Sequence, residues 1–572
     1  MKAIKITENS LRDGVQSLLA TRVSTQDMLE VARIFENIGF HSVEVWGGAT
    51  YDACLRYLNE DPFERLRTFK EIFAKTPLQM LLRGQNLVGY RHYSDDVLKE
   101  FIALSAKEGI EIFRIFDALN DISNLRLSIE EVRKNDAEAQ GAICYTTSPV
   151  HNLKFFLSYA KEFVALGCQS LAIKDMAGLL RPYDAYELVK AIKEEVGVPL
   201  SVHIHATTGF AFGSMLKAVE AGADVLDLSN SALSGGTSHP CTQSMVATLQ
   251  GTQWDTGLAL EPMEEASKIL REVRAKYAEF ESNYNLVDTE ILLSQIPGGM
   301  ISNLASQLKE QNAINRMREV AEEIIAVRKD FGYIPLVTPT SQIVGTQAVL
   351  NVLQNERYKT LTTESKNLIL GLYGKTPAPI DEKLVQKVAN QDLPQKPQNE
   401  LQKAQEESKE FAKTRTDVIS YALFGDVAKT FLKGEAKIFK PSAKMDLGDQ
   451  FEAKLLGQNY KIEVLKICRT QEGESVRIRI DDEEREIIFS SSSSQSQNHN
   501  QVENAVYSPM SGVLTKIFVH QGEQIKKGQV LGVVEAMKME NEILSDRDGE
   551  IDEICVKMGD NIQSSTVLFL LK

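Results

Sequence analysis

The sequence predicts an α/β protein in which a (β/α)8 TIM barrel with a helical extension is followed by a small β unit and a C-terminal β-sandwich domain. Three patterns lead to this prediction. Short apolar runs alternate with helical patterns over residues 1–235, unusual polar side chains stand where several runs end, and residues 503–572 contain an internal repeat. Strands that alternate with helices are typical of parallel sheets.

Length and charge limit the possible functions. The chain has 572 residues, about four times a typical domain, so we expect several domains. Lys and Arg total 64 against 79 Asp and Glu, and the net charge of −15 argues against a nucleic-acid partner. The six cysteines form no CxxC pair, which argues against a disulfide framework or a thiolate zinc site. No apolar run reaches the roughly 18 residues of a membrane span, and we expect a cytoplasmic protein.

Eight apolar runs in the first part of the chain have the length and composition of β-strands. They are Ala3–Ile6, Ser42–Trp46, Leu78–Leu82, Ile112–Phe116, Gly141–Tyr145, Leu171–Lys174, Ser201–His205 and Val225–Leu228. Their number suggests a closed barrel, although it also permits an open doubly wound sheet. Polar residues stand at or just after the ends of five runs: Asp13, Arg83, Asp117, Lys174, His203 and His205. Barrel enzymes build their sites at the carboxyl ends of the strands, and this placement therefore favours the barrel.

The domain organisation follows from composition. Residues 1–300 are expected to form the barrel, and residues 301–440 a helical extension with long amphipathic helices such as Leu304–Lys329. Strand-like alternation at 441–489 predicts a small β unit for association. Residues 490–502 are rich in Ser, Gln and Asn and predict a flexible linker before the last domain at 503–572.

The last domain consists of two similar halves with a lysine between them. Residues repeat at constant spacing, pairing Gly512 with Gly549, Ile517 with Ile554, Val519 with Val556, Gly522 with Gly559 and Ile525 with Ile562. Lys538 lies near the centre, in Glu535-Ala536-Met537-Lys538-Met539-Glu540. One lysine between two β halves is typical of swinging-arm carriers, whereas a plain surface lysine is the usual alternative.

This segment closely resembles biotinyl carrier domains, whose hallmark is Ala-Met-Lys-Met. Lipoyl domains share the fold but usually lack methionine on both sides of the lysine. The resemblance implies covalent biotin on Lys538, with Met537 and Met539 as the flanking cofactor-binding residues. It also implies a biotin protein ligase as a partner.

A second pattern indicates a metal site in the barrel. His203 and His205 are two positions apart in an apolar strand, so both imidazoles point to the same face. Imidazole is the commonest nitrogen ligand of transition metals, but most such pairs are packed or hydrogen-bonded instead. Asp13 after the first run could add an oxygen ligand, although a helix N-cap is the simpler interpretation of that residue.

Several motifs along nearly the whole chain together resemble one enzyme family. They are Ser10–Asp13, Leu82–Gly84, Phe113–Asp121, Ile173–Gly178, His203–His205, Pro297–Met300 and Val337–Ser341. The set resembles the carboxyltransferase domain shared by pyruvate carboxylase, the oxaloacetate decarboxylase α subunit and the transcarboxylase 5S subunit. The resemblance implies an enzyme that transfers a carboxyl group between carboxybiotin on its own carrier domain and pyruvate or oxaloacetate, through a metal-stabilised enolate.

The resemblance also implies the metal ligands. They are Asp13, His203, His205 and Lys174, with the lysine carbamylated on its side-chain nitrogen so that it offers an anionic oxygen. The ion is a divalent metal of the zinc, manganese or cobalt class. Without the resemblance, an ion pair between Lys174 and Asp175 would be the natural interpretation.

Three further residues receive catalytic roles from the resemblance. Gln16 and Arg83 hold the keto acid, the arginine by a two-pronged contact with its carboxylate. Thr338 shuttles a proton between the substrate methyl group and the biotin ring nitrogen. A turn before Pro339 would otherwise be the expected role of Thr338.

The sequence leaves two interpretations of the enzyme open. It contains no glycine-rich ATP-binding module before the barrel and no membrane segment after it, so we expect a subunit that acts with a partner. We also expect the chain to form a homo-oligomer. Ala206 stands where single-chain pyruvate carboxylases usually have Asp, which favours the α subunit of a sodium-pumping oxaloacetate decarboxylase, peripheral on its membrane pump subunit. The alternative is the carboxyltransferase subunit of a two-subunit pyruvate carboxylase, with a biotin carboxylase subunit as partner.

Two other classes of function explain the sequence less well. A carrier scaffold with a decayed barrel conflicts with the intact Asp13, Lys174, His203 and His205. Aldolase-like lyases share the barrel and the histidine pair but leave the biotinyl tail unexplained.

Overall fold

The computed structural model describes residues 3–281, 285–298, 300–301, 304–305, 308, 313–389, 397–436, 450–455, 458–470, 473–480, 483–490, 504–508, 510–536, 539–563 and 566–572. The chain divides into two compact units, one of Met1–Phe439 with Val506–Lys572 and one of Lys440–Ala505. The expected linker lies outside the described residues except for Ser490.

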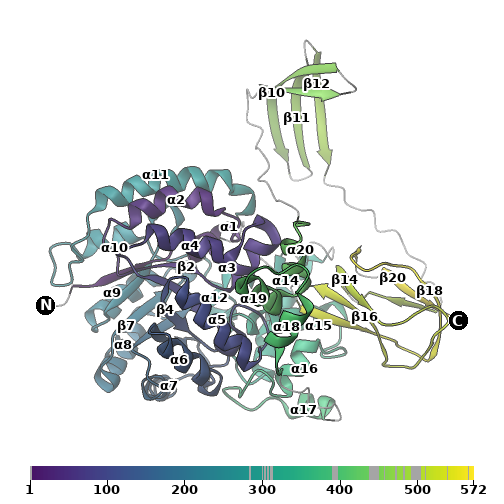
Figure 1. Ribbon diagram of the computed structural model, residues 1–572, viewed down its shortest axis with the longest axis horizontal. Helices are drawn as coiled ribbons and strands as arrows, with labels where there is room; N and C mark the ends of the chain where they lie inside the picture. Colours follow the sequence, from purple (N-terminus) through teal and green to yellow (C-terminus); the bar gives the residue numbers. More distant parts are fainter. Residues whose placement is uncertain are drawn as a thin grey trace. The chain divides into compact units, whose positions relative to one another are not determined.

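Eight parallel strands close into a barrel within residues 3–281, which are described without a gap (Figure 1). They are β1 (Lys5–Glu8), β2 (Ser42–Trp46), β3 (Leu78–Leu82), β4 (Ile110–Ile115), β5 (Glu138–Cys144), β6 (Ser170–Asp175), β7 (Leu200–Ile204) and β8 (Val225–Leu228). Strand β1 closes the barrel against β8, with Lys5 opposite Val225. Each predicted run corresponds to one strand, so the closed barrel is confirmed over the open sheet.

Helices surround the barrel and bury one apolar face each. They are α2 (Thr25–Phe35), α4 (Pro62–Ile72), α5 (Asp95–Lys107), α6 (Arg126–Lys134), α7 (Leu153–Ala165), α8 (Pro182–Val196), α9 (Ala211–Glu220), α10 (Thr242–Leu249) and α11 (Leu260–Lys276). Local sequence sets their starts: Ser24 caps α2 by accepting from the amide of Asp27, and proline opens α4 and α8. Between the strands and the helices, Trp46 of β2 stacks on Phe101 of α5 with ring centroids 5.7 Å apart.

The interior of the barrel is charged as well as apolar. Arg114 of β4 and Asp227 of β8 form a two-pronged ion pair, and both side chains are completely buried. Arg12 donates from Nε to Glu44 of β2 at 2.7 Å, and Arg114 donates to Gln140 of β5 at 2.5 Å. Buried charges destabilise a fold unless they are paired and hydrogen-bonded, so these contacts are required for the barrel to close around polar side chains.

The helical extension has a second hydrophobic core. Its helices are α12 (Ile291–Ser294), α14 (Met317–Asp330), α15 (Thr340–Leu353), α16 (Thr363–Ile369) and α17 (Glu382–Val388). Helix α15 is buried on nearly all sides, and its Ile343 packs with Ile324 and Val327 of α14.

The continuous helix predicted at Leu304–Lys329 is wrong. Helix α14 begins only at Met317, after a short 3₁₀ turn at Ile314–Arg316. The amide of Ala313 donates to the carbonyl of Leu308 at 2.7 Å, and both residues belong to the second core. Both segments that flank the turn bury apolar side chains in this one core.

The last helices of the extension return to the barrel. They are α18 (Glu400–Glu407), α19 (Arg415–Phe424) and α20 (Asp426–Leu432), and α19 packs beside α5 in Figure 1. Tyr51 shares a 2.7 Å hydrogen bond with Ser420, and its ring stacks on Phe424 with centroids 5.3 Å apart. Tyr93 donates to the carbonyl of Leu423 at 2.7 Å.

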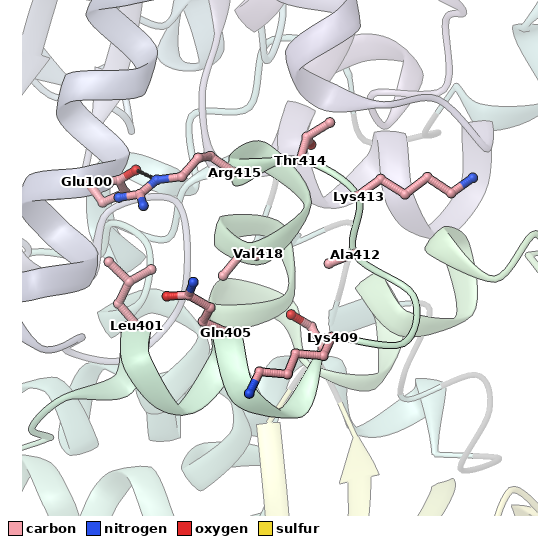
Figure 2. Close-up of a pocket in the computed structure, with 10 residues that line it drawn as sticks. Glu100, Leu401, Gln405, Lys409, Ala412, Lys413, Thr414, Arg415 and Val418 are labelled. Atoms are coloured by element: carbon pink, nitrogen blue, oxygen red, sulfur yellow. Dashed lines mark hydrogen bonds and ion pairs between the residues drawn. The ribbon is translucent and has the colours of Figure 1, made fainter.

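A surface cavity of about 320 Å³ lies between α5, α18 and α19 (Figure 2). Its described lining includes Leu401, Lys409 and Val418, and an ion pair from Arg415 to Glu100 borders it at 2.6 Å. The lining includes no residue that the sequence assigns to catalysis or metal binding. The cavity is therefore separate from the expected active site.

Arg328 of α14 joins the helical extension to the barrel. Its guanidinium donates to the carbonyl of Ile334 at 2.9 Å and to Gln295 at 2.5 Å. It also donates to the hydroxyl of Thr146 at 2.9 Å and the carbonyl of Thr147 at 3.0 Å, in the loop after β5. The side chain is only 6% exposed. One cation thus satisfies acceptors from three separate segments.

The second compact unit contains a four-stranded antiparallel sheet among its described residues. The strands are β9 (Gln450–Leu455), β10 (Gln458–Thr470), β11 (Gly473–Ile480) and β12 (Glu483–Ser490). They lie in the order β12-β11-β10-β9, so strands adjacent in sequence are also neighbours in the sheet. This is the small β unit expected from the alternation of the sequence. Its role in association stays a prediction.

The C-terminal domain shows the predicted repeat in its strands, which form two sheets: β13 (Ala505–Tyr507), β14 (Gly512–Ile517), β15 (Gln524–Ile525), β16 (Val530–Ala536), β17 (Met539–Leu544), β18 (Gly549–Ile554), β19 (Asn561–Ile562) and β20 (Val567–Leu571). Strands β14, β15 and β16 correspond to β18, β19 and β20 of the second half. Each sheet contains strands from both halves, because β14 of the first half pairs with β19 of the second, and β15 of the first pairs with β18 of the second. Leu514, Leu531 and Leu568 lie in the shared core.

None of the helices in the described part of the chain combines the length and the apolar character needed to cross a membrane.

Replacing Arg328 by Met should lower the melting temperature of the protein strongly, because it leaves four buried or partly buried acceptors without a charged donor. Hydrogen bonds to charged groups are worth about 1.5–3 kcal/mol each. Arg318→Met is the matched control on the same helix, since Arg318 is 93% exposed and pairs only with Glu322 at 3.3 Å among the described contacts. Equal melting temperatures for the two variants would contradict the structural role of Arg328.

Candidate active site and metal centre

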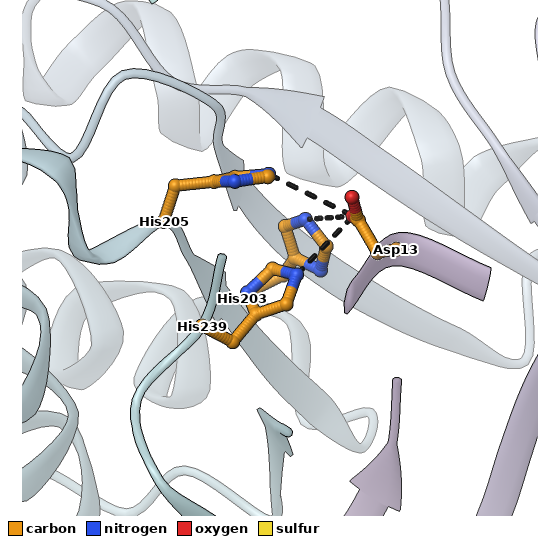
Figure 3. Close-up of side chains that lie close together, drawn as sticks. All are labelled: Asp13, His203, His205 and His239. Carbon is orange, nitrogen blue, oxygen red and sulfur yellow. Dashed lines mark ion pairs between the residues drawn. The ribbon is translucent and has the colours of Figure 1, made fainter. Parts of the chain in front are cut away.

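Four side chains converge at the carboxyl end of the barrel (Figure 3). Asp13 lies in a π-helical turn, Ser10–Gly14, directly after β1, and His203 and His205 come from the end of β7. His239 comes from the loop after β8. Oδ2 of Asp13 is 3.4 Å from Nε2 of His203, 3.7 Å from Nε2 of His205 and 3.2 Å from Nε2 of His239.

Hydrogen bonds to Nδ1 orient all three imidazoles. Nδ1 of His203 lies 2.8 Å from Oδ2 of Asp227, and Nδ1 of His205 lies 2.6 Å from the carbonyl of Thr237. Nδ1 of His239 lies 3.1 Å from the carbonyl of Ile204. A carbonyl or carboxylate only accepts, so each ring donates from Nδ1 and turns Nε2 toward Asp13.

Electrostatics keep the donors in the forms that bind a cation. Burial, followed by the charge of Lys174, holds the pKa of His203 well below its ordinary value. Burial lowers the pKa of His205 to about 3, so both rings are neutral. Burial alone would raise the pKa of Asp13, but the charge of the neighbouring Arg12, 2.9 Å away, holds it well below the ordinary value, so the carboxylate is ionised.

These residues fit a divalent transition metal. One ionised carboxylate and three imidazole nitrogens are a donor set suited to zinc or a similar ion. Nε2 of His205 and Nε2 of His239 are buried without a hydrogen-bond partner, which is costly unless their lone pairs bind something. Asp227 supports His203 by accepting the hydrogen bond from its Nδ1. Asp227 is ionised, because the charge of Arg114 outweighs the effect of burial and lowers the pKa of Asp227.

The structure brings Lys174 to the same place. Its Nζ lies 3.2 Å from Nε2 of His203, because Lys174 of β6 and His203 of β7 are opposite each other in register. The side chain is completely buried, and burial lowers the pKa of the amine. A neutral amine is the form that reacts with CO2, but the carbamylation of Lys174 stays a prediction.

His239 is the member of the cluster that sequence reasoning missed. It stands in Thr237-Ser238-His239-Pro240, eleven positions after β8 ends at Leu228, which is farther than the other site residues lie from their strands. The signal was present, because His239 is one of only 8 histidines and follows the last strand of a barrel.

The predicted keto-acid residues lie at the same end of the barrel. Gln16 accepts a 3.3 Å hydrogen bond from Arg12, the neighbour of Asp13. Arg83 follows β3 and donates from Nη1 to the carbonyls of Val88 and Gly89 at 3.1 and 2.8 Å, and its side chain is 8% exposed. Burial lowers the pKa of Arg83, but a guanidinium remains charged at neutral pH.

Thr338 is carried by the loop between α14 and α15 and is half-buried. The preceding Val337 packs with residues from four parts of the barrel: Leu81, Phe116, Ala118, Ala142, Cys144 and Ala172. Thr340 stabilises the loop, because its hydroxyl bonds to the carbonyls of Pro335 and Val337 at 2.5 and 2.7 Å. The helical extension thus places Thr338 over the inner residues of the barrel.

The proposed biotin-attachment residue, Lys538, and Met537 lie outside the described residues. They fall between β16 and β17, which pair antiparallel with Ala536 opposite Met539. Met539 is the first residue of β17. The motif was expected between the two halves of the domain, and β16 and β17 are the strands that flank it.

Three family models match the chain. A conserved carboxylase domain matches residues 291–487, an HMGL-like model matches residues 101–270, and a model of biotin-requiring enzymes matches residues 504–571. The three models together reach from β4 of the barrel through the helical extension to the C-terminal domain.

Full-length relatives agree with these models. The chain is 47% identical over 555 residues to a pyruvate carboxylase subunit of Methanocaldococcus jannaschii, covering 94% of each chain. It is 39% identical over 593 residues to the 2-oxoglutarate carboxylase large subunit of Hydrogenobacter thermophilus, covering 95% of this chain and 91% of that protein. The structure of the carboxyl transferase domain of Rhizobium etli pyruvate carboxylase with pyruvate and biocytin superimposes with a TM-score of 0.74 and 32% identity, covering 86% of this chain and 89% of that one.

The motifs, the barrel with its buried metal-binding cluster and the biotin-requiring domain are therefore parts of one enzyme, and the chain belongs to the family of biotin-dependent carboxyltransferases.

Proposed function

We propose that this chain is the carboxyltransferase subunit of a two-subunit pyruvate carboxylase. In this role it transfers a carboxyl group from the biotin of Lys538 to pyruvate and forms oxaloacetate, with a separate biotin carboxylase subunit as partner. The observation that carries the proposal is the match to a pyruvate carboxylase subunit over 94% of both chains. The interpretation as an oxaloacetate decarboxylase α subunit, which Ala206 favoured, shares the same half-reaction but has less support from these relatives.

A second candidate substrate is 2-oxoglutarate. The match to a 2-oxoglutarate carboxylase large subunit covers 95% of this chain at 39% identity. Pyruvate and 2-oxoglutarate share the α-keto acid that Arg83 would grip, and they differ only in the chain beyond the reacting carbon. A comparison of the two keto acids in one assay therefore separates these candidates.

Arg83 and Gln16 bind and orient the keto acid in the proposed reaction. Two backbone carbonyls hold Nη1 of Arg83, so the guanidinium has a fixed plane and retains further N–H groups for a two-pronged contact with a carboxylate. Gly48 makes this position possible, because a Cβ there would lie 2.4 Å from the guanidinium. Gln16 offers its side-chain amide beside Arg12 and Asp13.

Thr338 moves the proton. The N–C bond of carboxybiotin breaks and releases CO2, and the hydroxyl of Thr338 donates its proton to the biotin ring nitrogen. The same hydroxyl takes a proton from the methyl group of pyruvate, and the resulting enolate attacks the CO2 to form oxaloacetate. Asp13 and the imidazoles would hold a divalent metal, whose positive charge would stabilise the enolate electrostatically. The packing of Val337 against the barrel keeps the hydroxyl in place for both transfers.

The central test is reconstitution. The biotinylated chain, mixed with a biotin carboxylase subunit, ATP and bicarbonate, should form oxaloacetate from pyruvate. Lys538→Arg should abolish both streptavidin binding and product, because a guanidinium cannot form the amide that attaches biotin. Lys557→Arg, in the same domain, is the control and should be active. If the enzyme formed product from 2-oxoglutarate but not from pyruvate, 2-oxoglutarate would be the substrate instead. Biotin on the Lys538→Arg chain would refute the attachment site.

Thr338→Ala should separate proton transfer from binding. Turnover should fall by roughly 10²-fold or more, in the range of general acid–base groups. Metal content, biotinylation and pyruvate affinity should hardly change, because Arg83 and Gln16 remain. The measurement is steady-state turnover beside a thermal melt. Near-normal turnover with a lowered melting temperature would show that Thr338 is structural, and Ser341 would be the next residue to test.

Asp227→Asn should weaken metal binding although Asp227 is not a ligand. The change removes the charge that orients His203, and loss of such a supporting partner typically costs about 10–100-fold in metal affinity. Asp224→Asn is the matched control, since Asp224 is a nearby buried carboxylate that pairs with Lys193 at 2.7 Å instead. The measurement is the metal dissociation constant by chelator competition. Equal constants for the two variants would contradict this role of Asp227.

A further inference from the structure

We propose that helix α19 of the extension positions Arg83 for the keto acid, and that Tyr51 and Tyr93 are the positioning residues through which it acts. The inference rests on the proposed function, because it takes Arg83 as the group that binds the carboxylate of the keto acid. It gives a role in substrate binding to a helix that is far from the barrel strands in the sequence.

Two segments of the barrel hold the guanidinium of Arg83. One is the loop after β3, where the carbonyls of Val88 and Gly89 accept hydrogen bonds from Nη1 at 3.1 and 2.8 Å. The other is α3 (Gly48–Ala53), because the guanidinium lies so close to Gly48 that a Cβ there would overlap it. Movement of either segment would therefore shift the N–H groups that remain for a carboxylate.

Helix α19 holds α3 through Tyr51. The hydroxyl of Ser420 donates to the carbonyl of Thr416 at 2.9 Å, so Tyr51 is the donor in its 2.7 Å hydrogen bond with Ser420. The ring of Tyr51 also lies nearly parallel to that of Phe424, with 11° between the planes. Because Tyr51 and Ser420 are both buried, water does not readily replace their hydrogen bond. Helix α19 thus fixes α3 one turn after Gly48.

The same helix holds the loop after β3 through Tyr93. The hydroxyl of this buried tyrosine donates to the carbonyl of Leu423 at 2.7 Å. Its ring packs directly on Gly89, where a Cβ would overlap the hydroxyl group. Gly89 is one of the two acceptors of Arg83, so Tyr93 fixes an acceptor of the arginine and α19 fixes Tyr93.

The two contacts converge on one arginine. Tyr51 and Tyr93 come from different segments of the barrel, bond to neighbouring positions of α19 and support the two segments that hold Arg83. A two-pronged contact with a carboxylate requires that the plane of the guanidinium is fixed. Loss of either tyrosine hydroxyl should therefore weaken binding of the keto acid, whereas metal binding at Asp13 and the imidazoles should stay the same.

Pyruvate binding is measured directly, by isothermal titration calorimetry on the full chain loaded with metal. Tyr51→Phe and Tyr93→Phe should each raise the pyruvate dissociation constant about 3–10-fold, as expected for one lost hydrogen bond. In the reconstituted reaction, KM should rise more than kcat falls, and metal content should not change. Tyr421→Phe is the matched control on α19, because its hydroxyl makes an exposed bond to Glu407 at 3.2 Å. Natural pyruvate affinity in both tyrosine variants, even with lowered melting temperatures, would overturn the proposal.

The same substitutions in an Arg83→Lys chain separate positioning from general stability. Lysine keeps the charge but lacks the planar fork that the tyrosines orient. In this chain Tyr51→Phe and Tyr93→Phe should not raise the pyruvate dissociation constant further, because residues that act through one group are not additive. An equal increase in both backgrounds would overturn this inference alone. Natural pyruvate affinity of Arg83→Lys itself would refute the role of Arg83 in the proposed function, and this inference with it.

Gly48→Ala moves Arg83 without touching α19. The new methyl group would meet the end of a flexible side chain, so the arginine should shift at little cost to the melting temperature. We expect the pyruvate dissociation constant to rise at least as much as in the tyrosine variants. Natural affinity in Gly48→Ala would show that the place of Arg83 against α3 does not matter, and it would overturn the proposal.

Discussion

The active site depends on the buried ion pair between Arg114 and Asp227. The pair crosses the barrel from β4 to β8, where either charge alone would cost several kcal/mol. Because Arg114 keeps Asp227 ionised, Asp227 can hold the proton of Nδ1 in His203 and turn Nε2 toward the metal position. A charge pair that permits the barrel to close thus also sets the tautomer of a ligand.

A second buried ion pair fixes the state of the residue on the other side of the cluster. Arg12 bridges Glu44 of β2 and Asp13, so a cation that neutralises the barrel interior also keeps the carboxylate ligand ionised. The metal-binding cluster therefore rests on a layer of paired charges and not on an apolar core. Substitutions in this layer are expected to act on metal binding and on folding together, because each partner of a buried pair depends on the other.

The residues proposed for catalysis are positioned by separately packed cores. The barrel core carries the cluster, and a second core of helices places Thr338, whose neighbour Val337 packs on the barrel. A third core forms the two-sheet carrier domain, with β16 and β17 on either side of the motif that contains Lys538. This division gives the proposed biotin-attachment residue a domain of its own, while the residues proposed to bind the metal and the keto acid are fixed by buried contacts. Arg328 supports the arrangement by joining α14 to the loop after β5 with hydrogen bonds.

The sequence by itself determined the barrel strands, the two-fold repeat of the carrier domain and most of the cluster, because hydrophobic periodicity and strand-end polar residues are local patterns. Only the tertiary structure decided the rest. The break before Met317 depends on a core shared by distant helices, and the return of α19 to the barrel depends on contacts such as Tyr51 with Ser420. His239 joined the cluster for the same reason: the closed barrel brings the loop after β8 beside the ends of β1 and β7, and contacts of that loop, not a local pattern, decide which of its residues reaches the site.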